Sequence, residues 1–99
     1  MQLYAIRRRN AWKDAAELQA TGERSAAEGD KTPDDIRWIR SYVVSDDDGT
    51  LGTVCIYQAS SPEAIRDHAA RTGMPADEIT PIVDTVLVRP DPEPAAGEA

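Results

Sequence analysis

The sequence predicts a single α+β domain whose four strands and two helices follow the order β-α-β-β-α-β. Two observations carry this prediction. Four short segments are rich in β-branched and aromatic residues, and two segments between them consist mostly of helix formers, with Gly, Pro and Asp at the boundaries. A chain of 99 residues with 40% hydrophobic content suits one domain. We assign that domain to residues 1–90 and expect residues 91–99 to form a disordered acidic tail.

The first third predicts a strand followed by a helix. Residues 2–8 carry apolar side chains on both faces of an extended chain. Residues 11–29 are rich in helix formers, and Asn10 is the expected N-cap. The stripe at helical spacing is built mostly of small residues: Ala11, Ala15, Leu18, Gly22, Ser25, Ala26 and Gly29. Such a face allows a close approach to a sheet but contributes little hydrophobic energy.

Three consecutive arginines, at positions 7 to 9, end the first strand. They have two interpretations, an anion-binding patch or a solvated face. A basic run at the end of a strand is more commonly a solvated face.

The middle of the chain predicts a β-hairpin. Residues 36–45 and 51–59 are the two strands, and the turn between them contains an Asp-Gly step. On the first strand, Ile36, Trp38, Tyr42 and Val44 are expected on one face, interrupted by Arg40, with Ile39 and Val43 on the other. On the second strand, Cys55 and Tyr57 point one way and Val54 and Ile56 the other. The three aspartates of the turn lack the remaining ligands of a calcium loop.

Residues 62–72 predict the second helix. Ser60 and Ser61 offer caps, Pro62 suits the first helical position, and Gly73 suits the left-handed position after the last turn. Residues 82–88 are expected to form the last strand. This element order is the ferredoxin-like arrangement, in which a four-stranded antiparallel sheet carries two helices on one face. Because the strands are apolar on both faces, we expect a homodimer that packs sheet against sheet or closes a shared barrel.

Composition excludes several classes of partner. A net charge of −7 and a pI near 4.5 argue against binding to nucleic acid or to an anionic membrane. A single cysteine excludes an intramolecular disulfide and any iron–sulfur cluster held by one chain's cysteines. The N-terminal residues contain no apolar stretch of signal-peptide length, and no run approaches a membrane span. We therefore expect a cytoplasmic protein.

The only cysteine and the only histidine are the candidate metal ligands. A Cys55 thiolate and a His68 imidazole suit Ni(II), Cu or Zn better than Mg or Ca. Two donors make half a site, which Glu63 or the same pair from a second subunit would complete. The alternatives are a small buried hydrophobe for Cys55, a half-buried helix residue for His68 and a core residue for Tyr57, which could otherwise order a ligand. Whether Cys55 and His68 face one another is open at this stage.

Four motifs occur in a fixed order: W-I-x-S-Y-V from Trp38, C-x-Y-x-A from Cys55, I-R-x-H-A from Ile65 and G-x-P-A-D-x-I from Gly73. Over residues 36–90 the chain resembles the small nickel-binding ferredoxin-like domain family, formerly a domain of unknown function. The resemblance implies a dimeric ferredoxin-like fold and nickel binding in at least some members. Cys55, Tyr57, Glu63 and His68 lie on or beside these motifs.

Three functions remain open from the sequence. The first is a metal-binding buffer or sensor for nickel or a similar transition metal. The second is an enzyme of the dimeric α+β barrel type, with a pocket between sheet and helices lined by Tyr4, Trp38, Tyr57 and His68. The third is a non-catalytic protein-interaction module. No nucleophile elbow, P-loop or dinucleotide fingerprint is present, so we assign no catalytic residue.

Overall fold

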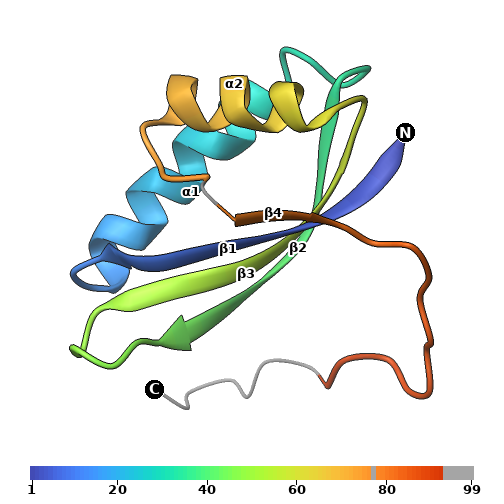
Figure 1. Ribbon diagram of the computed structural model, residues 1–99. Helices are drawn as coiled ribbons and strands as arrows, with labels where there is room; N and C mark the ends of the chain where they lie inside the picture. Colours follow the sequence, from blue (N-terminus) through green and yellow to red (C-terminus); the bar gives the residue numbers. More distant parts are fainter. Residues whose placement is uncertain (77, 93–99) are drawn as a thin grey trace.

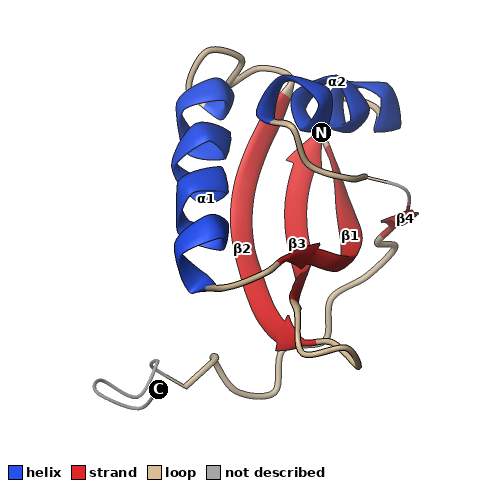
Figure 2. Cartoon of the chain, turned by 90° about the vertical axis from the view of Figure 1, so that its left-hand side faces the viewer, coloured by secondary structure: helices blue, strands red, loops and turns tan. Residues whose placement is uncertain are grey.

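A computed structural model describes residues 1–76 and 78–92. Its elements are β1 (Gln2–Trp12), α1 (Ala15–Gly29), β2 (Ile36–Ser45), β3 (Leu51–Ala59), α2 (Pro62–Thr72) and β4 (Glu78–Pro81). The strands form one antiparallel sheet in the order β2-β3-β1-β4, and both helices lie on the same face of it (Figure 1; Figure 2). The predicted ferredoxin-like α+β fold is confirmed. No helix among the described residues is long and apolar enough to span a bilayer.

Helix α1 begins later than the sequence predicted. Its N-cap is Asp14, whose Oδ1 accepts a hydrogen bond from the backbone N–H of Glu17 at 2.9 Å. Asn10, the expected cap, instead lies within β1 with φ of +51°. The strand runs on to Trp12 because this side chain is buried, and its indole N–H donates to Thr21 Oγ1 at 2.9 Å. Burial of one aromatic ring thus outweighed the helix propensity of the residues around it.

Helix α2 has the predicted bounds because its end signals are local. Ser61 Oγ accepts a hydrogen bond from the N–H of Ala64 at 3.2 Å, and Pro62 occupies the first turn. Gly73 adopts φ of +79° and donates its N–H to Ala69 O at 2.8 Å. The inward face of this helix consists of Ile65, His68, Ala69 and Thr72, all buried.

A β-bulge in β2 changes which of its side chains face the helices. The register with β3 pairs Trp38 with Tyr57 and Ser41 with Cys55, and it shifts between Trp38 and Arg40. The extra residue reverses the alternation beyond it. Trp38 and Tyr42 therefore lie on opposite faces, and the predicted shared face of Trp38, Tyr42 and Val44 is wrong.

The last strand lies earlier than predicted. β4 is only four residues long and pairs with β1 from Tyr4 to Arg7. Residues 82–88 are not a strand, and the apolar side chains after the half-buried Ile82 are exposed: Val83 by 95%, Val86 by 85%, Leu87 by 73% and Val88 by 76%. Ile79 packs against the core. This contact places residues 78–81, and not residues 82–88, beside β1 as the last strand. Residues 93–99 of the expected tail lie outside the described part of the chain.

The core lies between the sheet and the two helices. Its buried members are Tyr4, Ile6, Ile36, Cys55, Tyr57, Ala59 and Ile65. α1 contributes only Thr21 and Ser25 to the buried set, because its inward stripe is built of small residues. The other face of the sheet carries no helix (Figure 1).

Candidate functional site

A row of three hydrogen-bonded side chains joins three elements of the fold. Ser25 on α1 lies between Tyr57 on β3 and His68 on α2. Its Oγ is 3.1 Å from the Tyr57 hydroxyl and 2.9 Å from His68 Nε2. The rings of Tyr57 and His68 have centroids 5.9 Å apart. The row brings two of the four predicted site residues together through a serine.

His68 is a buried imidazole with one unfilled nitrogen. The residue is 1% exposed, and Nδ1 is buried with no hydrogen-bond partner among the described residues. Burial lowers its pKa below the ordinary value, and the positive charges of Arg71 and Arg8 lower it further, while Glu28 acts in the opposite direction. The imidazole is therefore neutral at neutral pH, the form that ligates a metal ion.

Tyr57 is a neutral phenol in this environment. Burial raises its pKa above the ordinary value, and the hydrogen bond with Ser25 and the charge of Arg8 offset part of that effect. Its ring stacks on Trp38 with centroids 6.1 Å apart. We conclude that Tyr57 lines the site as a neutral, hydrogen-bonded phenol and not as a phenolate.

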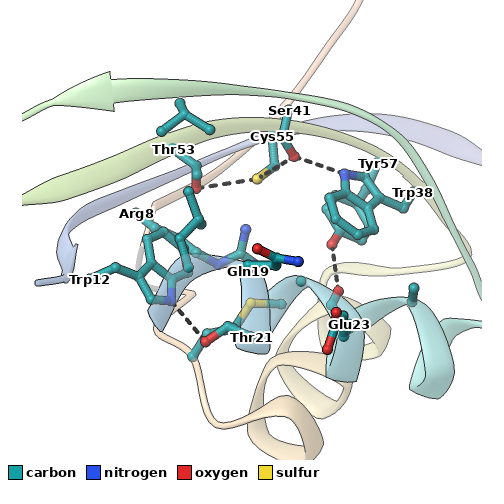
Figure 3. A pocket seen from close by; sticks show the side chains of 16 residues that line it. Arg8, Trp12, Gln19, Thr21, Glu23, Trp38, Ser41, Thr53, Cys55 and Tyr57 are labelled. Carbon is teal, nitrogen blue, oxygen red and sulfur yellow. Dashed lines mark hydrogen bonds between the residues drawn. The ribbon is translucent and has the colours of Figure 1, made fainter. Parts of the chain in front are cut away.

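Cys55 belongs to a second hydrogen-bonded row on the inner face of the sheet. Ser41 Oγ donates to Cys55 Sγ at 3.0 Å, and the thiol lies 3.3 Å from Thr53 Oγ1. The indole N–H of Trp38 donates to Ser41 Oγ at 2.7 Å (Figure 3). The β2 bulge creates this row, because it places Ser41 opposite Cys55. Cys55 is a free cysteine, 4% exposed.

Two cavities border these rows. One, of about 440 Å³, lies between α1 and the sheet and is lined by Cys55; the other, of about 350 Å³, is lined by His68 and Asp30. Tyr57, Trp38 and Ser25 line both cavities. Cys55 and His68 are thus placed on two sides of Tyr57, with no hydrogen bond between them.

Glu63 lies apart from the other predicted site residues. It is exposed in the first turn of α2, and its carboxylate is 3.6 Å from Arg66 Nη1. Across residues 1–76 and 78–92, no group of three or more His, Cys, Asp or Glu side chains is placed to hold a metal ion. The candidate ligands of the described residues are therefore placed apart from one another and do not form a preassembled metal site.

Two functional residues were missed or misread in the sequence. Ser25 was counted as a small member of the α1 stripe, although it links Tyr57 with His68. The sequence treats Arg8 together with its two neighbours, as an anion-binding patch or, more commonly, a solvated face, yet Arg8 alone is 1% exposed. Its alternation with the buried Tyr4 and Ile6 is the signal that could have placed it on the inner face of β1.

Comparisons with known proteins agree with this architecture. A search of curated proteins found no match. The crystal structure of SCO4226 from Streptomyces coelicolor A3(2) has a similar fold, with a TM-score of 0.66 and 20% sequence identity over 85% of this chain and 99% of that chain. The family model described as nickel responsive protein SCO4226-like matches residues 4–82. The family suspected from the four motifs is confirmed: the chain belongs to the nickel responsive protein SCO4226-like family.

Proposed function

We propose that the protein is a small cytoplasmic metal-binding protein that takes up Ni(II), or a similar late transition metal, as a buffer or sensor. The observation that carries this proposal is membership of a family described as nickel responsive. The chain's only imidazole and only thiol are the donors that such a metal prefers.

The surroundings of His68 support its role as a ligand. A histidine that binds a metal through one ring nitrogen usually donates its other N–H to a protein group, which fixes the tautomer. Ser25 Oγ lies in that position for Nε2, and Nδ1 is the ring nitrogen that has no partner within residues 1–76 and 78–92. The neutral imidazole needs to lose no proton before it binds.

The remaining ligands would come from Cys55, from carboxylates or from a second copy of the chain. Cys55 requires deprotonation, which couples metal uptake to proton release. Asp30 lines the same cavity as His68, and Glu63 is exposed at the surface beside Arg66.

We propose that the working form is a homodimer. The face of the sheet without helices and the exposed apolar side chains of residues 83–88 are both surfaces that a second copy would cover. Each subunit would then bring one His68 and one Cys55 to the assembly.

The test is native mass spectrometry of tag-free protein, apo and after titration with nickel, zinc and copper. We expect stoichiometric Ni(II) uptake by a dimer and loss of uptake in His68→Ala, because that change removes every imidazole in the chain. Cys55→Ser removes every thiol at nearly constant volume, so it should abolish any thiolate-to-nickel absorption band. Asp67→Asn, beside His68 on the exposed side of α2, is the matched control and should bind as the unmodified protein does.

One result would refute this assignment of ligands. If the double variant Cys55→Ser/His68→Ala keeps the full affinity for Ni(II), the metal is held elsewhere. If no metal is bound by the unmodified protein at all, the buffer or sensor function is wrong.

One observation favours the second candidate function, an enzyme with a pocket between sheet and helices. Trp38 and Tyr57 do line a cavity there, and His68 is one hydrogen bond beyond Ser25. A neutral imidazole in a row with a serine and a phenol has the means to move a proton. Turnover of a substrate that depends on His68 in metal-free protein would distinguish this function from metal storage.

A further inference from the structure

The cavity between α1 and the sheet has the size and lining of a small-molecule site. Its volume of about 440 Å³ lies within the range of about 300–1,000 Å³ common for ligand pockets. Apolar side chains dominate the lining: Trp12, Leu18, Trp38, Val43 and Met74. The space exists because α1 presents Gly22, Ser25 and Ala26 to it, residues too small to fill the gap above the sheet.

Arg8 places a positive charge in the wall of this cavity. Its side chain is 1% exposed, and only Nε has a partner, the carbonyl of Pro75 at 2.7 Å. Nη1 and Nη2 are buried and make no hydrogen bond to any described residue. The guanidinium carbon also lies over the Tyr57 ring, 5.9 Å from its centroid.

Unlike Arg8, the two arginines next to it in the sequence each have an acidic partner. Arg7 forms an ion pair with Asp46, and Arg9 with Glu78 at 2.7 Å. A buried guanidinium without an anion is strongly unfavourable, because the charge has lost its water and gained no partner. No ion pair of Arg8 occurs among residues 1–76 and 78–92.

The other buried polar groups around the cavity are already satisfied. The indole of Trp12 donates to Thr21, that of Trp38 donates to Ser41, and Tyr57 bonds with Ser25 (Figure 3). The unfilled hydrogen-bonding capacity of the wall is therefore concentrated in the two terminal nitrogens of Arg8. They present parallel donors, which match the two oxygens of a carboxylate.

We propose that this cavity binds a small organic carboxylate, with its anionic head on Arg8 and its apolar body among Trp12, Trp38 and Val43. Glu23 also lines the cavity, but from α1, and Figure 3 draws it on the opposite side from Arg8. That arrangement orients the ligand, because the carboxylate is attracted to the β1 side and repelled from the α1 side. This function goes beyond metal binding and requires no metal ion.

The test uses metal-free protein in the presence of a chelator, with 3-phenylpropionate and its neutral isostere 3-phenylpropionamide as probes. Both tryptophans of the chain line the cavity, so intrinsic fluorescence reports its occupation directly. We expect saturable binding of the carboxylate and binding of the amide weaker by about tenfold or more, since a charge-assisted pair is lost.

Two substitutions separate binding from folding. Arg8→Met keeps an apolar stem of similar length, so it should fold at least as stably as the unmodified protein while losing its preference for the carboxylate. Arg9→Gln removes the adjacent surface charge and should leave binding unchanged. Asp77→Asn, outside the described residues, tests whether a carboxylate of the chain itself competes with the probe; tighter binding in that variant would support an anion site at Arg8.

Three outcomes would overturn the proposal. They are equal affinity for the carboxylate and the amide, undiminished carboxylate binding by Arg8→Met, and no saturable signal with either probe at millimolar concentration. The comparison of the two probes needs no variant, so it remains decisive even if Arg8→Met fails to fold. Because metal is absent throughout, these results are independent of nickel binding.

Discussion

Replacing His68 with glutamine should flatten the pH dependence of stability as the pH falls below about 6.5. The folded protein lowers the pKa of His68 below its ordinary value of 6.5, chiefly through burial. Between the lowered folded value and 6.5, the unfolded chain therefore binds a proton that the folded chain does not. The contribution of the neutral His68 to the free energy of unfolding is therefore fully present above pH 6.5. It is lost as the pH falls from 6.5 through the lowered folded pKa.

The magnitude follows from one proton. A difference of one bound proton changes the free energy of unfolding by about 1.4 kcal/mol per pH unit, which is the limiting slope for a single group. A protonated His68, at 1% exposure, would also carry an N–H at Nδ1 that has no acceptor in the described part of the chain. The chain has no second histidine, so the comparison with His68→Gln isolates the contribution of this imidazole. The slope is thus assignable to one side chain.

The assay is urea unfolding of metal-free protein at a fixed concentration, at several pH values from 5 to 8. Fixed concentration matters because dimerisation would itself contribute to apparent stability. We expect the unmodified protein and Asp67→Asn to lose stability below pH 6.5 and His68→Gln to show no such loss. Parallel profiles for the unmodified protein and His68→Gln would refute a buried neutral imidazole in the folded state.

Three further substitutions and one control variant test the scaffold, each by urea or thermal unfolding. Ile65→Ala removes a fully buried side chain and should cost about 2–5 kcal/mol; a loss within the error of the measurement would contradict its place in the core. Gly73→Ala puts a side chain at φ of +79°, and we expect a loss of about 1–2 kcal/mol. Gly52→Ala forces a Cβ against Asp46 and the carbonyl of Arg8, so it should destabilise the protein, whereas an alanine at Gly49, which meets nothing within 4 Å, should cost only its backbone strain.

The parts of the fold that the sequence predicted are those with local causes. The bounds of α2 follow from a serine cap, a proline and a glycine, and the hairpin follows from its Asp-Gly step. These signals act within a few residues, so no knowledge of the rest of the chain is needed.

The failures have tertiary causes. The bulge after Trp38 depends on how β2 pairs with β3, and simple alternation therefore assigned Tyr42 to the wrong face. Residues 82–88 have an apolar composition typical of strands, but β1 pairs with residues 78–81 instead. An apolar composition indicates that a segment packs against another apolar surface. It does not indicate which surface that is.

The candidate site was predictable only in its donors. Cys55 and His68 could be singled out by residue type, but their separation by Tyr57 depends on the packing of α1 and α2 over β3. Ser25 and Arg8 were hidden for the same reason. Their roles arise from partners that lie far away in the sequence, such as His68 and Pro75.

The central position of β1 has a consequence for the order of folding. The hairpin of β2 and β3 closes locally, with Ser45 opposite Leu51, whereas β1 pairs Gln2 with Ala59 and Tyr4 with Pro81. Closing such long loops is slow, so we expect the hairpin to form early and β1 to dock late. Arg8 reaches Pro75 only after that docking. A chain stalled before this step has neither the cavity nor its charge, so ligand binding would report that folding is complete.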